Sequence, residues 1–282
     1  MNESLANRTA RVICALLTFT AVFSATAWAE QTGAGAIARL MEIIASEHRT
    51  PRYAVRDKYR HPLETLAFFE IRPNMTVVEI WPGGGWYTEI LAPFLKGEGK
   101  YYAAHRNRDT TDAGIQRYIK RYDDKLAARP EIYGEVVVTE LSRNKSAIAP
   151  PGSADIVLTF RNVHNWMKYG FEANIFEAMF AALKPGGILG VVEHRADPEE
   201  FPDPQALNGY VHEEQVMQMA EAAGFKFVAR SEVNANPRDA RNHPKGVWTL
   251  PPTLRLKDKD REKYLAIGES DRMSLKFVKP KP

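Results

Sequence analysis

The stretch that most constrains this chain covers residues 76–90 and reads TVVEIWPGGGWYTEI. Its first residues are β-branched and suit a strand buried in a parallel sheet. Pro82 and three glycines then break the strand, and helical spacing resumes from Tyr87. Glycines let a backbone approach a ligand closely, and a helix start offers free N–H groups. The stretch predicts a strand, a ligand-binding turn and a helix, with Glu79 facing the ligand; the alternative is a tight turn that binds nothing.

Strand-like and helix-like segments alternate along most of the chain. Besides the first strand, further strands are expected at residues 100–104, 134–139, 153–160, 188–193, 225–233 and 271–279. Segments with helical spacing separate most of them. This alternation predicts an α/β fold with a mostly parallel seven-stranded sheet, helices on both faces and a terminal antiparallel strand.

The glycine turn and three later segments carry a family resemblance. Glu79, Gly83 and Gly85 match the pattern acid-x-Gly-x-Gly-x-Gly, with Trp81 in place of the first glycine. The later segments are ADIVLTF at 154–160, LKPGGILGVVE at 183–193 and AGFKFV at 223–228. In this order they resemble class I S-adenosylmethionine (SAM)-dependent methyltransferases, over about residues 63–279. The chain looks like an exported bacterial branch of that family, which implies a Rossmann-like class I methyltransferase fold.

The resemblance also implies a cofactor site for SAM. It places Gly83, Gly84 and Gly85 beside the methionine part of SAM and lets Glu79 bind its amino group. Trp81, Trp86 and Tyr87 are candidates to face the sulfonium cation, since aromatic faces attract cations; packing in the core is the alternative. His105 follows the second strand, where the family usually has an acid that holds the ribose hydroxyls. An imidazole can also hydrogen-bond a hydroxyl, but less strongly than a carboxylate.

The loop expected after the fourth strand reads RNVHNW, residues 161–166, and in the family this loop lies beside the methyl acceptor. His164 is the candidate base, because an imidazole titrates near neutrality. Asn162 and Asn165 are candidates to orient a small-molecule acceptor. The alternative for His164 is a loop histidine bonded to backbone.

Two other functions compete with methyl transfer. His105, His164 and His194 each follow a strand, so a parallel sheet brings them to the edge that holds Glu79 and Glu193, and His243 is a further candidate. Neutral imidazoles and carboxylates suit zinc or iron, but no HxH or HxxxH spacing supports a metal site, and none is predicted. Because Trp81 and His105 depart from the family pattern, a binding protein without catalysis is the other alternative.

The N-terminus predicts export. Arg8 and Arg11 precede an apolar run, residues 12–27, and Ala27-Trp-Ala29 offers small residues for cleavage. Residues 1–29 are therefore interpreted as a signal peptide, and the mature protein as periplasmic or secreted without stable membrane insertion; an uncleaved anchor is the alternative. Cleavage removes Cys14, the only cysteine, which excludes disulfides and thiol chemistry.

Residues 30–62 are expected to form a helix and a basic, aromatic arm. The arm could hold an acidic ligand or cover the turn, and the alternative is a solvated connector. The resemblance implies that residues 63–282 form a methyltransferase-like domain, with an insertion at 234–270. The insertion is a candidate substrate loop or a surface flap, and its best candidates are Arg238, Asp239, His243 and Trp248. A formal net charge of +3 gives no reason to expect a nucleic-acid partner, and no oligomeric state is indicated.

Overall fold

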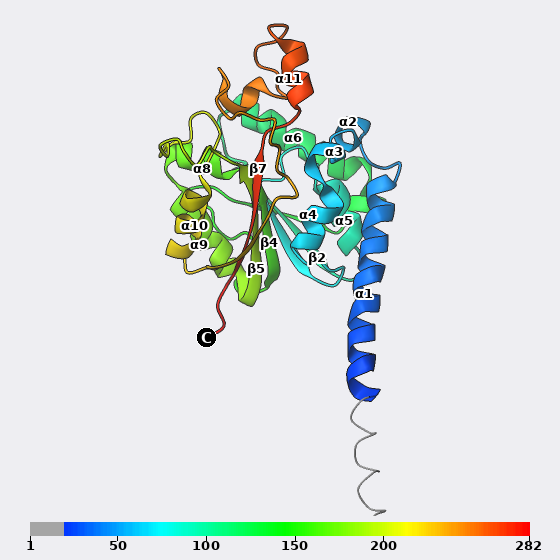
Figure 1. The fold of residues 1–282 in the computed structure, drawn as a ribbon. Helices are drawn as coiled ribbons and strands as arrows, with labels where there is room; N and C mark the ends of the chain where they lie inside the picture. The colour runs from blue at the N-terminus through cyan, green and yellow to red at the C-terminus, as the bar shows by residue number, and fades with distance from the viewer. Residues whose placement is uncertain (1–19) are drawn as a thin grey trace, which may run out of the picture.

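The computed structural model describes residues 20–282, with side chains from residue 33 onward. Its centre is a seven-stranded sheet in the order β3-β2-β1-β4-β5-β7-β6 (Figure 1). The strands are β1 (Thr76–Ile80), β2 (Lys100–His105), β3 (Val136–Glu140), β4 (Ala154–Phe160), β5 (Leu183–His194), β6 (Lys226–Ser231) and β7 (Arg272–Val278). β1 to β5 pair in parallel, whereas β7 runs antiparallel to both β5 and β6. The predicted fold class is confirmed.

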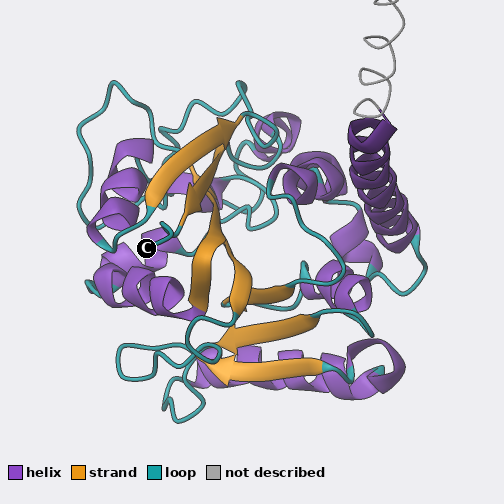
Figure 2. Cartoon of the chain, turned by 90° about the horizontal axis from the view of Figure 1, so that it is seen from below, coloured by secondary structure: helices purple, strands orange, loops and turns teal. Residues whose placement is uncertain are grey.

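Helices cover both faces of the twisted sheet (Figure 2). One face packs against α8 (Val163–Tyr169), α9 (Glu172–Ala182) and α10 (Glu213–Ala222). The other packs against α1 (Thr20–Ala45), α4 (Pro62–Phe68), α5 (Thr88–Leu95), α6 (Ala113–Ala128) and α7 (Pro130–Tyr133). The remaining elements are α2 (Pro51–Ala54), α3 (Asp57–Arg60), the 3-10 helix η1 (Gly246–Thr249) and α11 (Arg261–Ile267).

Alternation along the strands supplies both cores. In β1, Val78 and Ile80 point to the α8–α10 side, while Val77 points to the α5 side, and all three are fully buried. Glu79 has the same parity as Val77, so its side chain lies on the α5 side, at the carboxyl end of the strand. β1 lies between β2 and β4, where the strand order reverses direction, and open α/β sheets bind ligands at such a point.

One local expectation was wrong. Residues 161–166 were expected to be a loop, but helix α8 begins at Val163. Its first N–H groups are capped from another strand: the Glu193 carboxylate accepts from Val163 N at 2.6 Å and from His164 N at 3.4 Å. A carboxylate at a helix N-terminus satisfies free donors and the dipole together, which stabilises this short helix.

The N-terminal helix packs against the domain only through its later part. Ala36 and Leu40 are buried near α4 and α5, while Figure 1 shows the earlier turns extending away from the sheet. Residues 1–19 of the predicted signal peptide, with Cys14, lie outside the described residues, and the expected cleavage position after Ala29 falls within α1. Within residues 20–282, no helix combines the length and apolar character required to cross a membrane.

Candidate functional site

A cavity of about 990 Å³ opens at the carboxyl ends of β1 and β4. Glu79, Gly83 and Gly84 line it on the β1 side, and Asn162 and Asn165 line it on the β4 side. Asn162 also ties the two strand ends together, because its Nδ2 donates to Ile80 O at 2.8 Å. The two predicted halves of the site therefore face one cavity.

The glycine turn has the conformation that its sequence requires. Gly83 and Gly85 have φ values of 63° and 83°, in the left-handed region that glycine adopts freely. Gly84 is constrained by a close approach instead: the Tyr53 hydroxyl donates to its carbonyl at 2.9 Å, and a Cβ there would lie 2.4 Å from that hydroxyl oxygen. The turn is thus closed on one side by the N-terminal arm.

Trp81 lines the cavity without filling it. Its indole Nε1 donates to Leu141 O at 3.0 Å, and the ring packs on Trp166 and Phe171. The guanidinium of Arg106 lies 3.7 Å from the centre of the Trp81 ring. Trp81 therefore already holds a protein cation on its face.

The other two aromatic candidates also pack within the protein while lining the cavity. Trp86 donates to Tyr53 O at 2.9 Å, and the Arg60 guanidinium lies 4.7 Å from its ring centre. Tyr87 stacks on Phe160 with ring centres 3.6 Å apart. Both rings thus contribute to packing as well as to the wall.

Glu79 is buried among hydroxyl groups. Its Oε2 accepts from the Tyr101 hydroxyl and, at 3.5 Å, from Thr88 Oγ1, while Tyr122 bonds Thr88. Burial raises the pKa of Glu79 to about 7, although the bond from Tyr101 and the charge of Arg161 oppose the rise. Both bonds use Oε2, which leaves Oε1 available to a cationic ligand group.

His105 lies behind the glycine turn and is not among the residues that line the cavity. It is 1% exposed; its Nδ1 accepts from Arg106 N at 2.8 Å, and its Nε2 is buried without a full hydrogen bond. Burial lowers the pKa of His105 to about 4, and the Gly83 backbone partly opposes this. The imidazole is therefore neutral and lies next to the Gly83 backbone.

His164 belongs to a chain of three polar side chains. Its Nδ1 lies 3.0 Å from Glu193 Oε1, and its Nε2 lies 3.0 Å from Asn165 Nδ2. Because the carboxylate accepts, His164 carries its proton on Nδ1, and Nε2 accepts from Asn165. Asn165 lines the cavity, whereas His164 does not. The chain Glu193–His164–Asn165 thus reaches the cavity through the amide.

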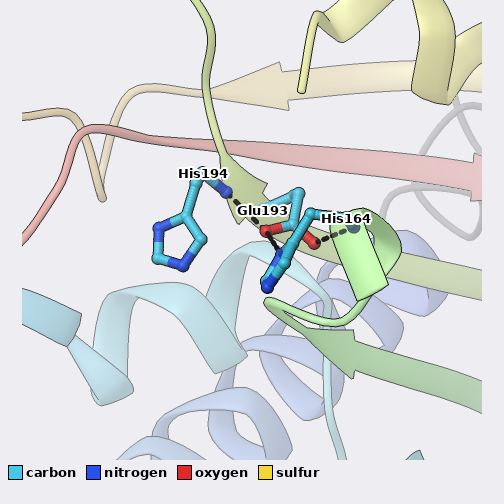
Figure 3. Close-up of side chains that lie close together, drawn as sticks. All are labelled: His164, Glu193 and His194. Atoms are coloured by element: carbon cyan, nitrogen blue, oxygen red, sulfur yellow. Dashed lines mark hydrogen bonds and ion pairs between the residues drawn. The ribbon is translucent and has the colours of Figure 1, made fainter. Parts of the chain in front are cut away.

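His194 completes a cluster with His164 and Glu193 (Figure 3). One potential ligand atom from each of the three lies within 4.8 Å of the others, and the two imidazole centres are 5.4 Å apart. Glu193, however, already accepts from four N–H groups, those of the His164 ring and the backbones of Val163, His164 and His194. Burial and the charges of Arg272, Arg161 and Arg60 lower the pKa of His194. The same positive charges disfavour a bound cation.

The other predicted histidines lie elsewhere. Among the residues that the structure describes, His105 takes no part in a cluster of potential metal ligands. His243 pairs with the buried Asp239 at 2.8 Å in the insertion. Trp248 of the insertion lies near the polar chain, with its ring centre 6.1 Å from that of His164. None of the insertion candidates lines the cavity.

The cavity wall also contains residues beyond the predicted site residues, three of them from the arm that was expected as a possible cover of the turn. Arg56, Arg60 and Tyr53 come from the arm, which Figure 1 shows at the end of the sheet where β7 begins. Asp112 caps α6 and also lines the cavity; the Thr-Thr-Asp sequence before helical spacing was a usable signal for the cap. Arg161 stands next to Asn162, but nothing local marked it as a wall residue.

Comparison with known proteins identifies the fold. No protein-family profile matches the sequence, and no curated protein matches it. Solved structures do match. A SAM-dependent methyltransferase from Aquifex aeolicus is 17% identical, with a TM-score of 0.52 over 79% of this chain and 92% of that one. The [4+2]-cyclase SpnF is 16% identical, with a TM-score of 0.51 over 79% and 81%.

A third match is phosphoethanolamine N-methyltransferase 2 from Haemonchus contortus, in complex with SAM. It is 14% identical, with a TM-score of 0.52 over 79% of this chain and 53% of that one. At these identities the likeness concerns the fold. Together with the sheet order and the antiparallel β7, it shows that this chain has the Rossmann-like fold of the class I SAM-dependent methyltransferases.

Proposed function

We propose that this protein is a SAM-dependent methyltransferase that acts on a small-molecule acceptor. The observation that carries the proposal is the cavity between β1 and β4, lined by Glu79 and the glycine turn. Its volume of about 990 Å³ suits a nucleoside-sized ligand together with an acceptor. The free Oε1 of Glu79 fits the ammonium of SAM, and the exposed turn backbone fits a close approach.

When bound, SAM supplies a methyl group already activated on a sulfonium, so the protein mainly aligns the acceptor and excludes water. Asn162 and Asn165 orient the acceptor. His164 Nε2 takes the proton that an acceptor hydroxyl or amine loses as the new bond to carbon forms, and Glu193 holds the ring in the required tautomer. Asn165 must first release Nε2. His105 supports the turn behind the ribose.

Calorimetric titration with SAM and S-adenosylhomocysteine tests the cofactor. We expect binding that weakens about tenfold or more in Glu79→Gln and is unchanged in the matched surface variant Glu98→Gln. Because Glu79 must be ionised to hold an ammonium, wild-type affinity should rise between about pH 6 and pH 8. Failure of both ligands to bind at millimolar concentration would exclude the proposal.

Release of S-adenosylhomocysteine in an acceptor screen tests catalysis and the role of His164. If His164 is the base, His164→Gln loses activity about a hundredfold, while Asn165→Ala keeps most of it. Equal losses in both variants would make His164 a positioning residue. Ligand binding without turnover of any acceptor would favour the alternative of a binding protein on this fold.

A metal-dependent enzyme is a second candidate, favoured by the 4.8 Å cluster of His164, Glu193 and His194. The saturated carboxylate and the neighbouring arginines argue against it. Metal analysis of protein purified without an affinity tag decides: one equivalent of zinc or iron would replace the methyl-transfer assignment of His164.

We also propose export by the predicted signal peptide. The support is the sequence pattern of residues 1–29, which places small residues before a cleavage position after Ala29. Intact-mass measurement of the protein from its natural compartment should give a chain that begins at Glu30. A retained N-terminus would favour an anchor.

A further inference from the structure

More arginine side chains than carboxylates gather in one part of the cavity wall. Arg56, Arg60 and Arg161 line the cavity, and Arg272 lies beside them. A single carboxylate, Glu269, accepts from Arg56, from Arg60 at 3.4 Å and from Arg272. Burial raises the pKa of Glu269, but the charges of Arg272, Arg60 and Arg56 outweigh burial and hold it well below its usual range. This group therefore keeps a net positive charge.

Arg161 is the member of this group without a counterion. Its backbone N–H donates to Val192 O at 2.7 Å, but within residues 33–282 its guanidinium makes no hydrogen bond or ion pair. The side chain is only partly exposed, within the cavity wall. A largely enclosed charge without a partner is costly, and an arginine fork matches a planar or tetrahedral anion.

The charge of this guanidinium acts on both halves of the site. Its charge lowers the pKa of Glu79 on the cofactor side and that of His194 on the side of the polar chain. Burial, Arg272 and Arg56 lower the pKa of Arg161 itself to about 10, which leaves it charged at neutral pH. Glu79, with its pKa near neutrality, is an incomplete counterion.

We propose that Arg161, with Arg60 and Arg56, binds a carboxylate or phosphate group of the methyl acceptor. That the anion belongs to a methyl acceptor rests on the proposed function. That an anion binds here rests on the unpaired guanidinium of Arg161. The acceptor is then an anionic small molecule, with its apolar part against Tyr87 and Phe160, which stack beside Arg161. The carboxylate of SAM is the other source of the same chemistry.

Benzoate and benzamide form a matched pair of probes, alike in shape and different in charge, and phenyl phosphate tests the phosphate case. They are titrated into the protein with saturating S-adenosylhomocysteine and again without it. We expect the wild type to prefer benzoate or phenyl phosphate over benzamide by about tenfold or more, with the preference falling as salt rises. Arg161→Gln should abolish it, and Arg161→Lys, which keeps the charge, should retain part of it.

Arg143→Gln is the control, because Arg143 lines the same cavity but donates to Tyr169 O at 2.6 Å. It should leave the preference unchanged. No preference in the wild type, or equal loss in both glutamine variants, would overturn the proposal. Competition between benzoate and S-adenosylhomocysteine would also overturn it. So would an Arg161→Gln variant that binds S-adenosylhomocysteine more weakly but binds 5′-methylthioadenosine as the wild type does. In either case Arg161 would hold the carboxylate of the cofactor. If S-adenosylhomocysteine fails to bind while benzoate is preferred, the proposed function fails and the anion site stands.

Discussion

Glu79 keeps its proton to a higher pH in the folded protein than in the unfolded chain, because burial raises its pKa from 4.5 to about 7. Between these values the folded state binds more protons, so the free energy of unfolding falls as the pH rises, by about 3 kcal/mol for this group. Glu79→Gln removes this contribution. In urea titrations from about pH 5 to pH 8, the stability of the variant relative to the wild type should therefore increase.

The control for Glu79 is Glu98→Gln, since the Glu98 side chain is 52% exposed and pairs with Arg39 at the surface. Its stability relative to the wild type should stay flat over the same range. A relative stability of Glu79→Gln that fell with pH would show that Arg161 and Tyr101 stabilise the carboxylate more than burial opposes it.

Trp81 has a φ of 47°, in the left-handed region where a glycine stands in the family pattern. Trp81→Gly and Trp81→Ala lose the same indole and the same bond to Leu141, so the difference between them isolates the backbone. We expect the glycine variant to be more stable by about 1 kcal/mol in urea unfolding, the reverse of the usual order in regular structure. Equal stability would mean that the turn relaxes once the indole is gone.

The same residue shows what the sequence could predict at this scale. The pattern Glu79 to Gly85 predicted the turn even with tryptophan at its first glycine position, because φ preferences are local. The position of the indole was not predictable, since Leu141 and Arg106 fix it from other segments. His105 was expected at the ribose for its place after the second strand, yet its ring lies behind the turn.

Among the elements, strands were predictable because β-branched runs and glycine turns are local signals. Helix α8 was not, because its cap comes from Glu193, about thirty residues along the chain. Asn162 occupies the N-cap position but its side chain bonds β1 instead. A sequence window around His164 contains no sign of either contact, so the polar chain that ends at Asn165 required the fold.

The arm formed by α2 and α3 is held by Glu89, a fully buried residue at the start of α5. Its carboxylate accepts from Thr50 N at 3.0 Å and from Lys125, and Arg49 Nε lies 3.7 Å away. Glu89→Gln removes the charge that these groups share. Amide hydrogen exchange should then speed up over residues 48–61 while β1 and β4 exchange as before, because those strands are buried elsewhere.

Glu64→Gln, at an exposed position in the neighbouring helix α4, is the comparison and should leave exchange in the arm unchanged. Equal acceleration in the arm and in β1 would mean that Glu89 supports the whole domain. The arm would then not be a separately anchored cover for the cavity.

At the scale of the whole molecule, the expected strand order was enough to predict which edge of the sheet carries the site, and the cavity lies at that edge. Its walls were predictable only in part, since the arm was expected as one possible cover but the residues that close the cavity were not. They join Arg56 of the arm, Asp112 of α6 and Arg143 beyond β3, segments whose packing depends on contacts far apart in sequence. A linear pattern fixes where parallel strands end but not which side chains close the space above them.

Glu269 joins the arm to strand β7, because its carboxylate pairs with Arg56 and Arg60 of the arm and with Arg272 of β7. Its pKa is lowered, so its stabilising effect is complete above 4.5 and is lost as the pH falls toward the folded value. Glu269→Gln leaves the buried guanidinium groups of Arg60 and Arg272, and the partly exposed one of Arg56, without this counterion. It should lower the free energy of unfolding by about 3–5 kcal/mol at pH 7. The deficit should shrink below about pH 4.5. A deficit under about 1 kcal/mol, as expected for the exposed control Glu98→Gln, would mean that the arm and β7 are joined by packing rather than by this carboxylate.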